Sequence, residues 1–251
     1  MTDIFEMVNG TDWRLQTQGS LSEDWKSPWT GDTHLKGSKI TVISIIELTK
    51  KKHLTLPIPN ATASCLNISK KTWLEARELR KASGLDKSIK NQVSFRCDSD
   101  AIDYLELIMQ SIVFAFTALE AFVNEIIPSD FRYEKKSKKA TEIYTKEEIE
   151  RWVSIDEKLD KIIPTILKVG TPKGRDRSWQ GFKDLKNIRD RLIHMKSDDR
   201  KSSGPEAKTI WTELMKTEPP YILAFTIVKY FIGDQGSTPS WFQHGSTHLK
   251  K

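Results

Sequence analysis

The chain of 251 residues is 37% hydrophobic and 29% charged, a balance typical of a globular protein with a sizeable core. Its 40 Lys and Arg residues against 34 Asp and Glu residues give a formal net charge of +6, which permits a polyanionic partner but does not require one. With two cysteines, Cys65 and Cys97, the sequence excludes a disulfide-rich scaffold and a multi-cysteine zinc site.

The N-terminal third, residues 1–98, predicts a small α+β extension. The chain begins without a basic segment followed by an apolar core, so we expect no signal peptide and a cytoplasmic protein. Residues 40–48 are rich in β-branched side chains and predict a strand, with residues 54–58 as its hairpin partner across a lysine-rich turn. Residues 69–80 predict a helix that stops near Gly84.

Residues 99–232 predict an almost entirely helical domain. Helices are expected at about residues 100–127, 146–168, 178–196 and 219–232, with one shorter helix before the last of them. A charged loop is expected between the first two, and Pro164 is expected to kink or end the second. The final residues, 233–251, predict a flexible tail. The predicted fold class is therefore mainly α, a bundle of four to five helices preceded by the α+β extension.

The first of these helices carries a narrow polar stripe. Its apolar part, residues 105–127, is long enough to cross a bilayer, but the polar residues within it favour a buried helix of a soluble protein. Five polar residues fall along one side of the helix: Glu106, Gln110, Thr117, Glu120 and Asn124. So narrow a stripe predicts either a lined cleft or subunit interface, or an edge that is merely exposed to solvent.

The helix over residues 178–196 carries a cluster of residues capable of chemistry. The cluster is the run Arg189-Asp190-Arg191-Leu192-Ile193-His194. Arginine can stabilise a crowded phosphate, and histidine, with an unperturbed pKa of about 6.5, can move protons at neutral pH. With an advance of about 100° per residue, Arg189 falls inside the apolar arc of the helix, where a charge is costly unless it is paired. We expect Glu120 on the long helix to be its partner.

His194 and Asp190 lie on the polar shoulder of the same helix. Since they are four residues apart, their side chains are expected to hydrogen-bond, which would fix the imidazole tautomer and favour its protonated form. Arg189 and His194 diverge by about 140° on a straight helix and cannot easily grip one phosphate together. Either the helix frays at His194, or two copies of the motif meet across a two-fold axis. We favour the second arrangement, which makes a homodimer part of the site.

The stretch Phe182–His194 resembles the signature of HEPN (higher eukaryotes and prokaryotes nucleotide-binding) domains. That signature is Arg, four to six residues, then His, often with a polar residue directly after the Arg. Here the spacing is Arg-x4-His, and Asp190 fills the polar position. The run Ala118–Asn124 is also similar to the early helix of many such domains, so the resemblance covers about residues 100–232.

The resemblance implies a metal-independent endoribonuclease, usually dimeric, whose paired motifs face each other in a composite cleft. Such domains occur in toxin–antitoxin modules and in antiviral, abortive-infection systems. The resemblance makes Arg189 and His194 the catalytic pair and Asp190 a polar auxiliary. In the mechanism that we expect, Glu120 and Asn124 orient Arg189 or the substrate. Asp190 departs from the more common Asn and adds a negative charge near the cut site.

RNA is the expected substrate, cleaved to a 2′,3′-cyclic phosphate and a 5′-hydroxyl. Six basic residues flank the motif and are expected to hold the RNA backbone: Arg175, Arg177, Arg191, Lys196, Arg200 and Lys201. No cofactor is expected, nor a metal site, because no two histidines stand at metal-ligand spacing beside a carboxylate. Trp152 and Trp179 are interpreted as core residues rather than as platforms for bases.

The expected partners are RNA, a second copy of the chain and an antitoxin or activating protein, without a membrane. Two alternatives to the nuclease stay open. One is a non-catalytic HEPN-like module that binds nucleotides, RNA or a partner protein. The other is a structural helical module, in which His194 caps a helix end and Arg189 forms a plain buried ion pair.

Overall fold

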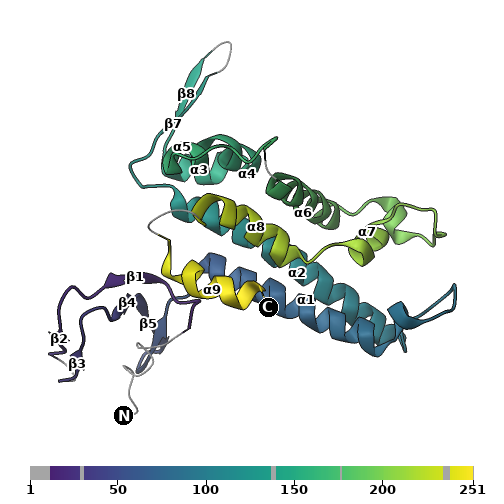
Figure 1. The fold of residues 1–251 in the computed structure, drawn as a ribbon, viewed down its shortest axis with the longest axis horizontal. Coiled ribbons are helices and arrows are strands. Elements are labelled where there is room, and N and C mark those ends of the chain that lie inside the picture. Colours follow the sequence, from purple (N-terminus) through teal and green to yellow (C-terminus); the bar gives the residue numbers. More distant parts are fainter. Residues whose placement is uncertain (1–11, 29–30, 137–139, 176, 234–237, 251) are drawn as a thin grey trace. The chain divides into compact units, whose positions relative to one another are not determined.

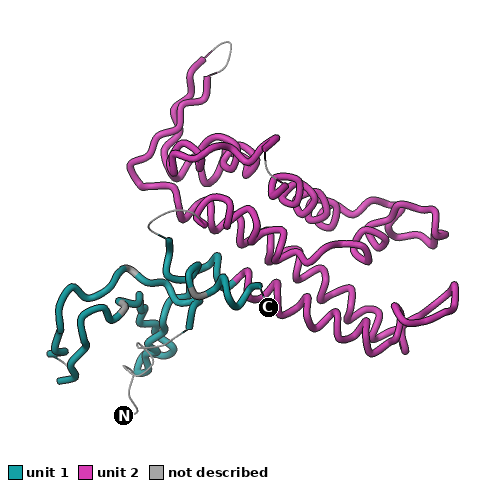
Figure 2. The backbone as a smooth tube through the Cα atoms, in the orientation of Figure 1, with its two compact units in different colours: residues 1–64, 237–251 teal, residues 65–236 magenta. Residues whose placement is uncertain are grey.

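A computed structural model describes residues 12–28, 31–136, 140–175, 177–233 and 238–250 of the chain (Figure 1). These residues form a mainly α fold with small pairs of antiparallel strands, as the sequence predicts. Two compact units are distinguished, unit 1 (residues 1–64 with 237–251) and unit 2 (residues 65–236) (Figure 2). The division therefore falls inside the first helix and not near residue 98.

In unit 1 the described strands form three antiparallel pairs. These are β1 (Thr17–Ser20) with β4 (Lys39–Thr41), β2 (Trp25–Lys26) with β3 (Thr33–His34), and β5 (Ile43–Thr49) with β6 (Lys52–Pro57). The predicted hairpin is confirmed as β5–β6, in which Ile43 lies opposite Pro57. The single strand predicted over 40–48 is divided between β4 and β5, because its two parts pair with different strands.

The helix predicted at 69–80 is α1 (Ala61–Ala82), which begins earlier than expected. Asn60 precedes its first turn, and its Oδ1 accepts a hydrogen bond from the N–H of Ala63 at 2.9 Å. This side chain satisfies one of the backbone donors that the start of a helix leaves unpaired. The predicted stop near Gly84 is confirmed, and Gly84 has a left-handed backbone with φ of 66°.

The C-terminal residues contain a helix where the sequence predicted a flexible tail. This helix, α9 (Ser240–Lys250), has Trp241, Phe242 and Leu249 buried. Its Gly245 lies against Trp13, since a Cβ added there would be 2.5 Å from Cε3 of the indole ring. The prediction failed for two reasons. The apolar residues of α9 are few and widely spaced, and the contact of Gly245 is with Trp13, a residue near the other end of the chain.

Unit 2 contains most of the helices. Besides most of α1, they are α2 (Asp98–Ile126), α3 (Lys146–Trp152), α4 (Ile155–Glu157), α5 (Ile163–Leu167), α6 (Arg177–Ile193), α7 (Ile210–Lys216) and α8 (Pro220–Ile232). A π-helical turn (Lys158–Ile162) joins α4 to α5, and short 3-10 turns occur at Leu85–Lys87 and Ser197–Arg200. One antiparallel hairpin, β7 (Tyr133–Lys136) with β8 (Thr141–Tyr144), extends from these helices.

The core of unit 2 is formed where α2, α6 and α8 pack against one another (Figure 1). Phe122 of α2 and Phe231 of α8 are both buried, with ring centroids 6.3 Å apart. By length and composition α2 could cross a membrane, and half of its most apolar window is buried inside the protein. The bounds of α2, α6 and α8 lie close to those predicted, because each helix has a strong apolar pattern.

The segment predicted as one helix over 146–168 is broken into α3, α4, the π-helical turn and α5. Val153 is extended after α3, and Oγ of Ser154 then accepts the N–H of Glu157 at 3.3 Å, which starts a new helix. Pro164 lies in the first turn of α5, directly after the π-helical turn, and the helix continues past it to Leu167. The charged loop expected before this segment contains the β7–β8 hairpin.

Candidate functional site

The apolar face predicted for α6 is confirmed except at its last residue. Phe182, Leu185, Ile188 and Leu192 are buried, and α6 packs on α2 and α8. Ile193, predicted to belong to the same face, is 55% exposed. Arg189 lies at the edge of this face, with a side chain that is 21% exposed. The structure therefore places a permanent cation at the border between the helical core and solvent.

The guanidinium of Arg189 lies over the ring of Phe116, with Cζ 3.6 Å from the ring centroid. Since Phe116 is buried, this face of the guanidinium is shielded from water and is held by a cation–π interaction. Nη2 lies 3.7 Å from Oε1 of Glu120, and Nη1 lies 3.0 Å from Oδ1 of Asp190. The predicted pairing of Arg189 with Glu120 is confirmed.

These contacts use only part of the donor capacity of Arg189. The 3.7 Å between Nη2 and Glu120 exceeds the length of about 2.7–3.2 Å typical of an N–H···O hydrogen bond, so it is an ion pair without a hydrogen bond. Nε is buried and has no hydrogen-bond partner among the described residues. Arginine in this arrangement has one face stacked, while Nη2 can still donate to an incoming oxyanion.

Asp190 belongs to a series of alternating charges that ends at Arg189. Besides Nη1 of Arg189, its carboxylate faces Nζ of Lys186 at 3.7 Å, and Lys186 lies 3.1 Å from Oδ2 of Asp156. Burial raises the pKa of Asp156, but hydrogen bonds from Lys183 and Lys186 outweigh it and lower the pKa overall. This series holds the N-terminal side of the motif in place.

His194 follows the last helical residue and is exposed to solvent. Its backbone N–H donates to the carbonyl oxygen of Asp190 at 3.0 Å and completes the last turn. The hydrogen bond expected between the side chains of Asp190 and His194 is absent, because the carboxylate of Asp190 forms ion pairs with Arg189 and Lys186 instead. Within the described part of the chain, the imidazole of His194 makes no hydrogen bond and no ion pair.

Asn124, one turn beyond Glu120 on α2, contacts a residue that the sequence did not single out. Nζ of Lys158 lies 3.0 Å from Oδ1 of Asn124 and 3.1 Å from the carbonyl oxygen of Glu150. Lys158 is only 5% exposed. Burial lowers the pKa of Lys158, and the negative charges of Glu120 and Glu150 offset this only in part. A second cation is therefore buried beside the polar end of α2.

The polar stripe of α2 faces solvent in the single chain. Its first two members, Glu106 and Gln110, line a groove of about 530 Å³ between α1 and α2, together with Glu75 and Glu78. At the other end of the stripe, Glu120 is 52% exposed. An exposed stripe is compatible with both predicted alternatives, a subunit interface and a plain solvent edge.

The basic residues predicted to hold RNA divide into two groups. Five of the six are exposed, namely Arg175, Arg177, Lys196, Arg200 and Lys201, and Arg177 lines a groove of about 560 Å³ bordered by α6, α7 and α8. Arg191 instead makes a 2.6 Å ion pair with Asp199, whose side chain is fully buried. The structure thus uses Arg191 to anchor the turn after α6, and we leave it out of the RNA-binding surface.

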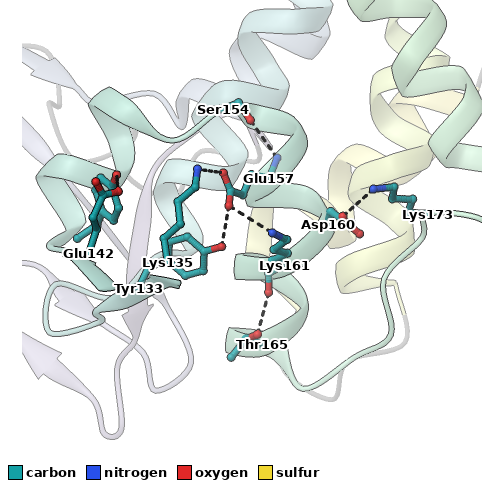
Figure 3. A network of polar contacts seen from close by, with 10 residues as sticks. Tyr133, Lys135, Glu142, Ser154, Glu157, Asp160, Lys161, Thr165 and Lys173 are labelled. Carbon is teal, nitrogen blue, oxygen red and sulfur yellow. Dashed lines mark hydrogen bonds and ion pairs between the residues drawn. The ribbon is translucent and has the colours of Figure 1, made fainter. Parts of the chain in front are cut away.

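A second polar cluster surrounds Glu157, at the start of the π-helical turn (Figure 3). Glu157 accepts hydrogen bonds from Tyr133 at 2.8 Å, from Lys135 at 2.7 Å and from Lys161 at 3.4 Å. Burial and the contact with Glu157 raise the pKa of Tyr133 to about 12. Because its cations are paired with carboxylates, this cluster fastens the β7–β8 hairpin to the helices and offers little net charge to a ligand.

The two tryptophans interpreted as core residues differ. Trp179 is half-buried and packs on Phe182, with ring centroids 5.2 Å apart. Trp152 is 65% exposed, and the guanidinium of Arg151 lies 4.6 Å from the centroid of its ring. The core interpretation of Trp152 was wrong because α3 ends at this residue, and Ile149 rather than Trp152 lies on the buried face.

No family model, no curated protein and no solved structure matches the chain. Among the described residues, no group of three or more His, Cys, Asp or Glu side chains is placed to hold a metal ion. What the protein does must therefore be inferred from its own residues.

Proposed function

We propose that the chain is a HEPN-like, metal-independent endoribonuclease that cleaves RNA to 2′,3′-cyclic phosphate and 5′-hydroxyl ends. The observation that supports this best is the setting of Arg189. Its guanidinium is stacked on Phe116 and leaves Nη2 without a hydrogen bond to any described residue, and its helix ends one residue before the exposed His194. This combines a pre-positioned oxyanion donor with a solvent-accessible imidazole on one short segment.

In the proposed reaction the ribose 2′-oxygen attacks the adjacent phosphorus while its proton passes to a base. The bond from phosphorus to the 5′-oxygen breaks, and that oxygen takes up a proton. His194 carries one of these proton transfers. Arg189 stabilises the negative charge that builds up on the phosphoryl oxygens in the transition state. DNA is spared because it lacks the attacking hydroxyl.

The site is proposed to be composite, with two copies of the chain meeting across a two-fold axis. Within one chain Arg189 turns towards α2, whereas His194 is exposed beyond the end of α6. A second copy would bring its own His194 towards Arg189. The exposed stripe of α2 that ends at Glu120 is the proposed contact surface, and Arg175, Arg177 and Lys196 would hold the RNA backbone.

A non-catalytic HEPN-like module that binds nucleotides, RNA or a partner protein is the second candidate. It is favoured by one observation, the pairing of Arg189 with two carboxylates, Asp190 and Glu120, which an incoming phosphate must compete with.

As a nuclease, the protein would act in the cytoplasm as a toxin or antiviral, abortive-infection effector. It would then be held in check or activated by a partner protein.

The test of the proposed activity is incubation of the purified protein with end-labelled RNA in the presence of EDTA. We expect cleavage, product ends that resist phosphatase until acid opens the cyclic phosphate, and no cleavage of DNA of the same sequence. If the protein binds the RNA without cutting it, the proposed nuclease activity is wrong and the non-catalytic binding module is supported. Loss of cleavage in EDTA would contradict the metal-independent mechanism.

The composite site predicts complementation between two inactive variants, Arg189→Ala and His194→Ala. Each variant alone is expected to be inactive. A mixed dimer keeps one intact site, made from Arg189 of one copy and His194 of the other, so an equimolar mixture should regain about one quarter of the wild-type rate. If both residues of a site came from the same chain, no mixed dimer would have an intact site and the mixture would stay inactive.

A further inference from the structure

Lys158 is a charged residue in an apolar setting. It is 5% exposed, and its neighbours Leu159 and Ile162 in the π-helical turn are also buried. Removing a charge from water costs free energy, so a buried lysine needs hydrogen bonds or an opposite charge to compensate that cost. π-helical turns are rare and often occur where a side chain must be placed for function.

The partners of Lys158 are neutral oxygens rather than a carboxylate. Its ammonium donates to Oδ1 of Asn124 at 3.0 Å and to the carbonyl oxygen of Glu150 at 3.1 Å. The second acceptor is available because Glu150 lies in the last turn of α3, where carbonyl groups lack helical partners. No described ion pair joins Lys158 to an acidic side chain, which indicates that the ammonium does more here than neutralise a charge.

The contact with Lys158 fixes the orientation of the Asn124 amide. An ammonium group can only donate hydrogen bonds, so the atom of Asn124 that faces it must be the oxygen. The nitrogen of the amide, Nδ2, therefore points away from Lys158, and no hydrogen bond from Nδ2 to a described residue is present. Asn124 and Glu120 are four residues apart on α2, so this amide lies on the same helix face as the carboxylate that pairs with Arg189.

We propose that Lys158 is a positioning residue that holds Asn124 as a hydrogen-bond donor for RNA bound at Arg189. The acceptor would be a phosphate or ribose oxygen next to the scissile bond, so that Asn124 Nδ2 and Arg189 Nη2 contact the same stretch of RNA backbone. This inference rests on the proposed RNA cleavage and adds to it two residues with distinct roles. Lys158 does not touch the substrate itself.

Asn124→Asp is the most informative variant, because it separates folding from function. The new carboxylate accepts the hydrogen bond of Lys158 and gives that buried ammonium an opposite charge, so the melting temperature should rise by roughly 2–4 °C. The donor is lost and an anion takes its place, so kcat/KM for RNA cleavage in EDTA should fall by about 100-fold or more. Asn91→Asp, at an exposed position between α1 and α2, is the matched control and should change kcat/KM by less than about threefold.

Lys158→Met tests the positioning role directly. Methionine keeps the length and apolar stem of lysine but cannot bind Oδ1, so the Asn124 amide is free to turn. We expect an unchanged or higher melting temperature and a fall in kcat/KM of about 10-fold. In the double variant, Lys158→Met should cause no further loss of activity on top of Asn124→Asp, because the donor that it positions is already absent.

Different results would overturn the proposed RNA cleavage and the positioning role of Lys158. A wild-type protein that neither binds nor cuts RNA overturns the proposed function, and with it this inference. A wild-type protein that cuts RNA, together with an Asn124→Asp variant of equal activity, overturns the positioning role alone. A Lys158→Met variant that loses stability in step with activity shows a purely structural lysine and also overturns it.

Discussion

An Arg189→Lys substitution is expected to lower the rate of metal-independent RNA cleavage by about 10²–10³-fold, although it keeps the positive charge. A lysine ammonium cannot lie flat on Phe116 as the guanidinium does. It also cannot face Glu120 and Asp190 from two separate nitrogens, as Nη2 and Nη1 do. The measurement is kcat/KM for a labelled RNA in EDTA, with the melting temperature of each variant recorded beside it.

Arg151→Lys is the matched control for this substitution. Arg151 is an exposed arginine on α3 whose guanidinium lies 4.6 Å from the centroid of the Trp152 ring, outside the proposed site. We expect its exchange to change kcat/KM by less than about threefold, since it removes a stacked guanidinium that has no proposed role in cleavage. An Arg189→Lys protein as active as this control would show that the planar guanidinium is not used, and the proposed site would be wrong.

The parts of the fold that the sequence predicts well are those set by local pattern. α2, α6 and α8 each have a strong apolar periodicity, and their bounds follow from it. The break within 146–168 also has a local cause, Ser154 followed three residues later by Glu157, a helix-start pattern that the apolar run masked. α9 depends instead on the contact of Gly245 with Trp13, far away in the sequence, and no local pattern reveals it.

The same distinction applies to the site. The Arg189–Glu120 pair was predictable, because a charge inside an apolar arc needs a partner and the apolar α2 offered few. Lys158 could have been found by that reasoning, since it lies among the apolar residues Ile155, Leu159 and Ile162. The stacking of Arg189 on Phe116 depends on how α6 and α2 are aligned, which the sequence does not state.

The failed expectation at Asp190 has a simple physical origin. A spacing of four residues on a helix links Asp190 to His194 on one side and to Lys186 on the other. The carboxylate of Asp190 forms ion pairs with two cations, Arg189 at 3.0 Å and Lys186 at 3.7 Å, and the imidazole of His194 is exposed to solvent. Spacing alone gives the possible partners of a side chain, and the balance of charges around it decides among them.

The largest effect on stability is expected at Asp199, in the turn that follows α6. Its carboxylate is fully buried and accepts hydrogen bonds from the N–H of Ile210 at 2.9 Å, the N–H of Lys196 at 2.8 Å and Nη2 of Arg191 at 2.6 Å. Asp199→Ala leaves two backbone donors and a largely buried cation without their acceptor. We expect the melting temperature at neutral pH to fall by roughly 10 °C.

Asp198→Ala is the control for this change, because Asp198 lies in the same turn, is exposed and pairs with an exposed lysine, Lys201. Its melting temperature should stay within roughly 2 °C of wild type.

Acid provides a second test of Asp199. Hydrogen bonding, foremost from the N–H of Ile210, lowers the pKa of Asp199 below its ordinary value of 3.8, although burial opposes this. Because the pKa is lower in the folded state, the stability that the carboxylate provides is fully present above pH 3.8. It is lost as the pH falls through the folded pKa. The difference in melting temperature between wild type and Asp199→Ala should therefore stay constant from neutral pH to about pH 5 and narrow only below pH 4. A difference that persists unchanged in strong acid would show that the ionised carboxylate is not what holds this turn.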